Sequence, residues 1–214
     1  MHTTSPALPP SSRSRRVLFA AVAGAVLATM SLLSPTVGSL VRPAQAAEDA
    51  APSADAVEET GLEVGRLAAH IAETWKMPLA ATQRIVEAAF SQAQAQGVSP
   101  TLILAVVAQE SSFRTTARSS YGAQGLMQVS ARHHADKLKG LQSSALYRPE
   151  TNIRVGTQVL AEYLEQHNGR LDQALRKYSG NASSYPRKIR AFWTRLEQVR
   201  RTETIDAAQP VPSA

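Results

Sequence analysis

Apolar residues recur every three to four positions along most of the chain, whereas the strict alternation of a half-buried strand is scarce. This spacing predicts amphipathic helices over residues 61–75, 78–96, 149–167, 171–178 and 184–200. Pro opens two of these segments and Gly or Asn follows two of them, as is typical of helix ends. We therefore expect an all-α fold.

One further predicted helix, over residues 99–110, is apolar on nearly every side between Leu102 and Ala108. Ser99 is placed to cap this helix and Pro100 occupies its first turn, and both residue types favour a helix start. Because a helix without a polar face must be surrounded by other elements, we expect it at the centre of the core.

Glu110 stands at the C-terminal end of this central helix. Burial there raises the pKa of a carboxyl group, because desolvation disfavours the charged form. The negative end of the helix dipole acts in the same direction. Glu110 is thus expected to hold a proton, which is the state that a general acid needs.

A loop is predicted over residues 111–125, where Gly122 and Gly125 allow tight turns. Two short helices are expected after this loop, one from about Gly125 or Leu126 and one over residues 131–138.

The first residues of the chain have the pattern of an export signal. Three arginines precede an apolar stretch from Val17 to Leu33, and Ala44-Gln45-Ala46 fits a cleavage site. We expect residues 1–46 to be a signal peptide removed before Ala47, so that the protein is exported to the periplasm or cell envelope. An uncleaved N-terminal membrane anchor is the alternative.

The rest of the chain divides by composition. Residues 47–60 are rich in Ala, Pro, Ser and acids, which predicts a disordered lead-in. Residues 61–97 are predicted to be a helical pair, either the N-terminal part of the main domain or an accessory arm. Residues 98–200 form the main domain, and residues 201–214 are predicted to be a disordered tail.

Two motifs in the main domain carry a resemblance to a known family. Glu110-Ser111 is followed, fifteen positions after the glutamate, by Gly125-Leu126-Met127-Gln128. Because of these motifs, the chain resembles the lytic transglycosylase (SLT) domain family of the goose-type-lysozyme-like superfamily. The resemblance extends from Val98 to Ala191. The resemblance implies a lysozyme-like helical domain with a substrate groove, to which Gly125 and Leu126 contribute, and an enzyme that cleaves peptidoglycan glycan strands without a cofactor.

The resemblance also implies a mechanism with one catalytic residue. Glu110 would protonate the glycosidic oxygen between N-acetylmuramic acid and N-acetylglucosamine. It would then take the proton of the muramic acid C6 hydroxyl, which attacks C1 of the same sugar and yields a 1,6-anhydro product. Most glycosidases need a second carboxylate. No other acidic residue of the main domain lies in a motif, which fits a single-acid mechanism.

Further site residues are carried over from the family position by position. Ser119 matches a serine near the substrate acetamido group, Met127 a residue of the sugar groove, and Gln128 a residue that hydrogen-bonds near the catalytic carboxylate. Tyr178 matches a tyrosine whose hydroxyl orients that carboxylate. Asn181 is expected to supply a sugar contact, because serine stands where the family has asparagine after this tyrosine. Met127 as core filler and Tyr178 as a core-edge residue are the structural alternatives.

The charge of the main domain points to an anionic partner. Residues 98–200 contain 15 Lys and Arg against 7 Asp and Glu, a net charge of +8. For an exported protein, the carboxylates of peptidoglycan stem peptides are nearer candidates than nucleic acid, so no nucleic-acid partner is expected. A solvated basic face without a partner is the alternative.

Two other functions stay open on the sequence alone: a hydrolytic goose-type lysozyme, and a catalytically weak peptidoglycan-binding module of an envelope assembly. His133-His134 has no Cys or carboxylate at ligand spacing, so no metal site is expected. Asn152 begins a segment that resembles a family helix, and we interpret it as a helix-start residue packed in the core.

Overall fold

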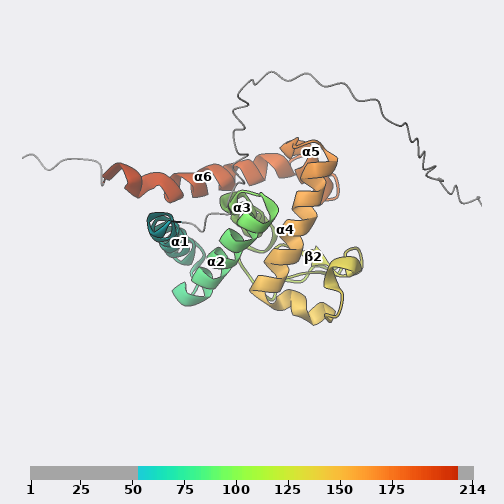
Figure 1. Cartoon of the computed structure of the whole chain (residues 1–214). Helices are drawn as coiled ribbons and strands as arrows, with labels where there is room; N and C mark the ends of the chain where they lie inside the picture. Colours follow the sequence, from blue (N-terminus) through green and yellow to red (C-terminus); the bar gives the residue numbers. More distant parts are fainter. Residues whose placement is uncertain (1–52, 207–214) are drawn as a thin grey trace, which may run out of the picture. The chain divides into compact units, whose positions relative to one another are not determined.

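The chain is helical over most of residues 53–206, the part that the computed structural model describes (Figure 1). The predicted all-α class is thereby confirmed, whereas the predicted signal peptide and its cleavage site lie outside the described residues. The elements in chain order are α1 (Ala54–Trp75), α2 (Leu79–Gln96), α3 (Pro100–Ser111), β1 (Ala123–Gln124), β2 (Val129–Ser130), the 3-10 helices η1 (Ala135–Leu138) and η2 (Ser143–Tyr147), α4 (Pro149–Gln166), α5 (Leu171–Tyr178) and α6 (Tyr185–Asp206).

The four helices from α2 to α5 begin and end within one residue of the predicted bounds, because local signals fix their ends. Gly97 ends α2 in the left-handed conformation, with φ 64°. At the start of α3, the Ser99 hydroxyl accepts a 3.3 Å hydrogen bond from the Leu102 amide, and Pro100 is the first helical residue. Within residues 53–206, no helix combines the length and the apolar character of a membrane span.

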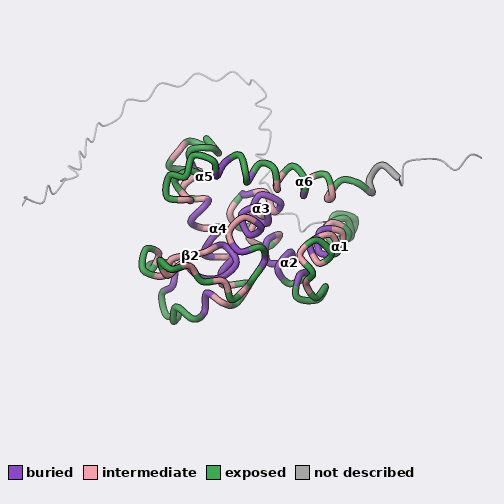
Figure 2. Tube along the Cα trace, turned by 180° about the vertical axis from the view of Figure 1, so that it is seen from behind, coloured by how far each residue is buried: buried purple, intermediate pink, exposed green. Residues whose placement is uncertain are grey.

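Helix α3 is the centre of the core, as its apolar sequence predicted. Every residue from Thr101 to Ala108 is buried, and α2 and α6 pack against it (Figure 2). Helix α2 also packs against α1 and α4, and α4 packs against α5. Because α3 is enclosed in this way, its C-terminal end is held in a fixed position, and Glu110 lies in that last turn.

Helices α1 and α2 contribute to the same core as the rest of the described chain and are not an accessory arm. Leu67 and Ile71 of α1 are fully buried in the hydrophobic cluster that contains α3. Helix α1 packs against both α2 and α6. Arg200 of α6 forms ion pairs with Glu63 of α1 at 2.8 Å and with Glu197 at 3.0 Å.

Two predicted boundaries are wrong. Helix α1 begins at Ala54, capped by the side chain of Ser53, although a disordered lead-in was expected up to residue 60. The Thr60 hydroxyl donates to the Ala56 carbonyl inside the helix and does not cap a later start. Helix α6 continues to Asp206 because neither Gly nor Pro interrupts it there, so the predicted tail begins too early.

The two short helices predicted after the loop are also wrong. Strands β1 and β2 form an antiparallel hairpin with Gln124 opposite Val129. Gly125 and Gln128 lie within the connecting turn with φ values of 75° and 49°, which a helix does not allow. Only the short 3-10 helix η1 occupies part of residues 131–138.

Candidate active site

A cleft of about 470 Å³ opens at the C-terminal end of α3, and Glu110 is among the residues that line it. The other walls are the segment that leads into β1, the turn between β1 and β2, the end of α5, and the first turn of α6. The cleft is thus built by segments that are far apart in the sequence and meet around the end of the central helix.

The carboxyl group of Glu110 is half-buried, and two effects shift its pKa in opposite directions. Burial raises its pKa above the ordinary value, as the sequence predicted. The hydroxyl of Tyr185 donates a 2.5 Å hydrogen bond to Glu110 Oε1, which stabilises the charged form and lowers the pKa. Burial is the larger effect, so the protonated form is favoured relative to a carboxyl group in water.

The hydrogen bond to Glu110 corrects a prediction. Tyr178 was expected to orient this carboxylate, but its hydroxyl donates to the carbonyl oxygen of Met127 at 2.9 Å. Tyr185, the first residue of α6, makes the contact with Glu110 instead. Tyr178 still lines the cleft, and the pKa of its hydroxyl is raised by burial and by the charge of Glu110.

The turn between β1 and β2 is fixed by one buried side chain of α4. Asn152 is fully buried, and its amide nitrogen donates to the carbonyls of Gln124 and Leu146 at 2.8 and 2.7 Å. Its amide oxygen accepts from the backbone nitrogen of Met127 at 2.7 Å. A Cβ atom at Gly125 would lie 2.2 Å from the Asn152 amide nitrogen, so only glycine fits there. Asn152 is therefore more than a helix-start residue, because it sets the position of the turn.

Of the motif Gly125-Leu126-Met127-Gln128, only Gln128 lines the cleft. Met127 was expected in the sugar groove, but its side chain is fully buried and lies against Gly156, where a Cβ would be 2.6 Å from its sulfur. Leu126 is fully buried and Gly125 is also buried. The side chain of Gln128 donates to the Gly125 carbonyl at 2.9 Å. The first three residues of the motif thus support the wall of the cleft from behind.

The remaining predicted site residues differ in their placement. Ser119 lines the cleft, and its hydroxyl accepts a 3.0 Å hydrogen bond from the backbone nitrogen of Ala123. Asn181 is exposed with φ 74° and is not among the lining residues, although Ala182 is. The cleft also includes Tyr121, which is 96% exposed at its rim.

A second cavity of about 250 Å³ adjoins the cleft and shares Gln128 and Tyr178 with it. His133 and His134 contribute to its walls. Within residues 53–202, where side chains are described, no group of three or more His, Asp or Glu is arranged to hold a metal ion.

Glu110 is the only carboxylate among the described residues that line the two cavities. The other acidic residues between residues 98 and 172 are Asp136, Glu150, Glu162, Glu165 and Asp172. Four of them form ion pairs elsewhere: Asp136 with Lys137 at 2.9 Å, Glu150 with Arg84 at 2.6 Å, Glu162 with Lys137 at 2.8 Å, and Asp172 with Arg190 at 2.8 Å.

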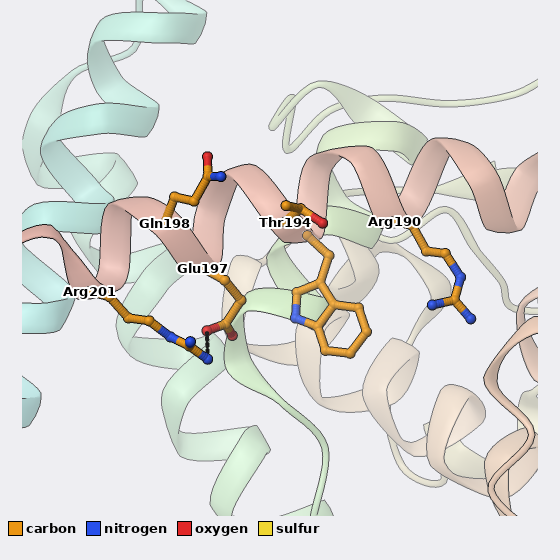
Figure 3. Close-up of a pocket in the computed structure, with 6 residues that line it drawn as sticks. Arg190, Thr194, Glu197, Gln198 and Arg201 are labelled. Carbon is orange, nitrogen blue, oxygen red and sulfur yellow. Dashed lines mark ion pairs between the residues drawn. The ribbon is translucent and has the colours of Figure 1, made fainter.

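A separate hollow of about 400 Å³ lies along α6 and contains none of the predicted site residues (Figure 3). Trp193, Glu197 and Arg201 line it, and Figure 3 shows the ion pair between the last two. The Trp193 ring nitrogen donates to the Thr101 hydroxyl, which in turn donates to Glu197. This hydrogen bonding fastens α6 to the start of α3.

Two comparisons with known proteins show what the chain is similar to. The sequence pattern of the transglycosylase SLT domain matches residues 87–198, slightly more than half of the 214 residues. The fold is similar to an X-ray structure of an inactive mutant of the lytic transglycosylase Slt from Pseudomonas aeruginosa, with 22% identity and a TM-score of 0.44. That similarity covers 58% of this chain and 25% of the Slt chain, so this chain spans about a quarter of that protein.

Proposed function

Since the chain belongs to the transglycosylase SLT domain family, we propose that it is an exported peptidoglycan lytic transglycosylase with Glu110 as its catalytic acid and base. The observation that carries the proposal is the position of Glu110. It is a half-buried carboxyl group with a raised pKa, at the wall of a cleft lined by no second carboxylate among the described residues. A protonated carboxyl group is the form that can donate to a leaving oxygen.

In the proposed reaction, Glu110 donates its proton to the glycosidic oxygen between N-acetylmuramic acid and N-acetylglucosamine. The bond from C1 of muramic acid to that oxygen breaks, and the departing sugar leaves with a hydroxyl group. The Glu110 carboxylate then removes the proton of the muramic acid C6 hydroxyl, whose oxygen forms a bond to C1. The carboxyl group is protonated again, the product is a 1,6-anhydro sugar, and no water is consumed.

The C6 hydroxyl belongs to the sugar that it attacks, so its effective concentration at C1 is high. A second carboxylate to activate water is therefore unnecessary, which fits the composition of the cleft. The hydrogen bond from Tyr185 supports the second half of the cycle, because it stabilises Glu110 while the carboxylate is charged.

Digestion of purified sacculi followed by mass spectrometry of the released muropeptides tests this proposal. Products that end in 1,6-anhydro-muramic acid are lighter by one water than the products of hydrolysis, and we expect the lighter series. Release of only the heavier series would make the protein a hydrolytic goose-type lysozyme. Binding to sacculi without any release would make it a peptidoglycan-binding module.

Export is proposed from the sequence of residues 1–46 alone. Sequencing the N-terminus of the protein recovered from the periplasm or cell envelope is expected to give a chain that starts at Ala47. A chain that still carries its first residues and sediments with membranes would indicate an uncleaved N-terminal membrane anchor and not a cleaved signal peptide.

A further inference from the structure

Lys188 brings a positive charge into the cleft that contains Glu110. It lies three positions after Tyr185, so the two residues are on the same side of α6. Both line the cleft, and Lys188 is exposed. One turn of α6 thus carries both Tyr185, which contacts the Glu110 carboxyl group, and the solvent-accessible ammonium group of Lys188.

Lys188 has no ion-pair partner among the described residues, and Glu110 is the one acidic residue that lines the cleft with it. Between Asp172 and Glu197 the sequence contains no Asp or Glu. Among residues 53–202, whose side chains are described, no carboxylate forms an ion pair with Lys188, whereas Arg190 two positions later pairs with Asp172. The basic residues of this acid-free segment are Arg176, Lys177, Arg187, Lys188, Arg190 and Arg195.

The adjoining cavity has the same sign of charge. Lys177 contributes to its walls, with its ammonium group 5.9 Å from the centre of the Tyr163 ring. Burial lowers the pKa of His134 in this cavity, which favours the neutral imidazole. Each of the two cavities thus has a lysine in its wall, and the one carboxyl group that lines them, that of Glu110, has a raised pKa.

The hydrogen bond that the Glu110 carboxyl group receives comes from Tyr185 and not from Lys188. Burial and the Tyr185 hydrogen bond account for the shifted pKa of Glu110, and the Lys188 ammonium group is not among the causes. An exposed cation that lines the cleft and has no ion-pair partner among the described residues is placed to meet the substrate.

We propose that Lys188 binds a carboxylate that the glycan strand carries as a substituent, and that it thereby selects anionic strands over neutral polysaccharides of the same backbone. This inference rests on the proposed function. The carboxylate has two possible sources: the lactyl group of a muramic acid without a peptide, or the stem peptide of a substituted one. An ammonium group has three donors on a flexible stem and can meet either.

The test measures binding by the whole chain carrying Glu110→Gln, so that turnover does not consume the ligand. Isothermal titration compares Lys188→Met, Lys188→Arg and, as a matched control, Lys139→Met in this background. Lys139 is an exposed lysine that lines neither cavity. The ligands are chitohexaose, which is neutral, glycan strands stripped of peptides by an amidase, and strands of matched length that retain their stem peptides.

We expect Lys188→Met to weaken binding of one class of anionic strand by about 5- to 12-fold. This loss lies between the loss expected for an exposed ion pair and that expected for a charge-assisted hydrogen bond. Chitohexaose binding is expected to stay unchanged, Lys188→Arg to retain most of the affinity, and Lys139→Met to match the parent. A loss limited to stripped strands identifies the lactyl carboxylate, and a loss limited to the others identifies the stem peptide.

Two results overturn the inference. One is binding of both anionic strands within twofold of the parent in Lys188→Met, and the other is an equal loss for chitohexaose. Product release by the protein with Glu110 intact is measured separately. Anhydro products together with charge-independent binding would overturn this inference alone, whereas charge-dependent binding without any products would overturn the proposed function alone.

Discussion

The hydroxyl of Tyr185 lies 2.5 Å from Oε1 of Glu110, although 75 positions separate the two residues in the chain. The bond joins the last turn of α3 to the first residue of α6, and these two helices are packed together. Because the packing fixes both ends, the carboxyl group has one supported orientation in the cleft. The same bond opposes the effect of burial on the pKa of Glu110.

Tyr185→Phe is expected to shift the pH dependence of turnover. The hydrogen bond from Tyr185 lowers the pKa of Glu110, and its removal therefore raises this pKa further. As a consequence, the decline of activity in alkaline solution moves to higher pH. Maximal turnover is expected to fall about 10- to 100-fold, since a hydrogen bond to a charged group contributes roughly 1.5–3 kcal/mol. Rates of muropeptide release across pH measure both effects.

The control for this experiment is Tyr178→Phe. It removes a hydrogen bond to the Met127 carbonyl and leaves the contact with Glu110 in place, so the alkaline limb is expected to stay at the parent position. An alkaline limb that moves equally in both variants, or in neither, would contradict the assignment of Tyr185.

Glu110→Gln is expected to abolish most turnover while the protein stays folded and binds sacculi. A positioned acid or base contributes about 10²–10⁴-fold, and here one residue acts in both roles, so the loss belongs at the upper end. Glu165→Gln on α4 is the matched control, since Glu165 is exposed and lines neither cavity. An equal loss in Glu162→Gln or Asp172→Asn would favour a hydrolase with two carboxylates.

The same substitution is expected to change how stability depends on pH. The pKa of Glu110 in the folded chain is raised above its ordinary value of 4.5. Below that value the acid is protonated in both the folded and the unfolded chain. As pH rises from there through the folded pKa, the unfolded chain ionises first, and the folded state loses stability.

Glu110→Gln removes this loss. The free energy of unfolding of the variant minus that of the parent should therefore be larger at pH 7 than at pH 4, which means that the variant gains stability relative to the parent as pH rises. Urea denaturation at the two pH values measures the difference, and the other titrating groups are common to both proteins. A difference that is constant with pH would show that the carboxyl group is not destabilised by its site.

Asn152→Ala is expected to destabilise the fold by about 2–5 kcal/mol, because it leaves three buried backbone groups without their partner. Thr151→Ala at the neighbouring half-buried position is the control, with an expected change below about 1 kcal/mol. Thermal unfolding measures both. Activity per folded molecule should also fall in Asn152→Ala, because the turn that carries Gln128 loses its support. A stability equal to that of the control would contradict the proposed clamp.

The helices could be predicted because their signals are local. Ser99, Pro100 and Gly97 mark the junction of α2 and α3 within four residues of sequence, and the structure uses all three. The hairpin after the loop could not be predicted in this way. Its geometry depends on Asn152, which reaches the turn from 25 positions further along the chain.

The candidate site shows the same division. Glu110 was found from the apolar run that precedes it and the motif that follows it, both close in sequence. Tyr185 carries no such signal, because a tyrosine followed by Pro186 is equally typical of an ordinary helix start. Its importance comes from the packing of α6 against α3, which places it beside Glu110.

The contact of α1 with the rest of the core has a practical consequence for anyone who excises the domain. The family match runs over residues 87–198, so it starts inside α2, stops inside α6 and omits α1 entirely. A fragment with those ends would expose the partners of Leu67 and Ile71 to water and lose Arg200. The residues of the family match include the candidate active site, whereas independent folding needs every segment that covers the apolar core. In this chain those segments begin with α1, more than thirty residues before the start of the family match.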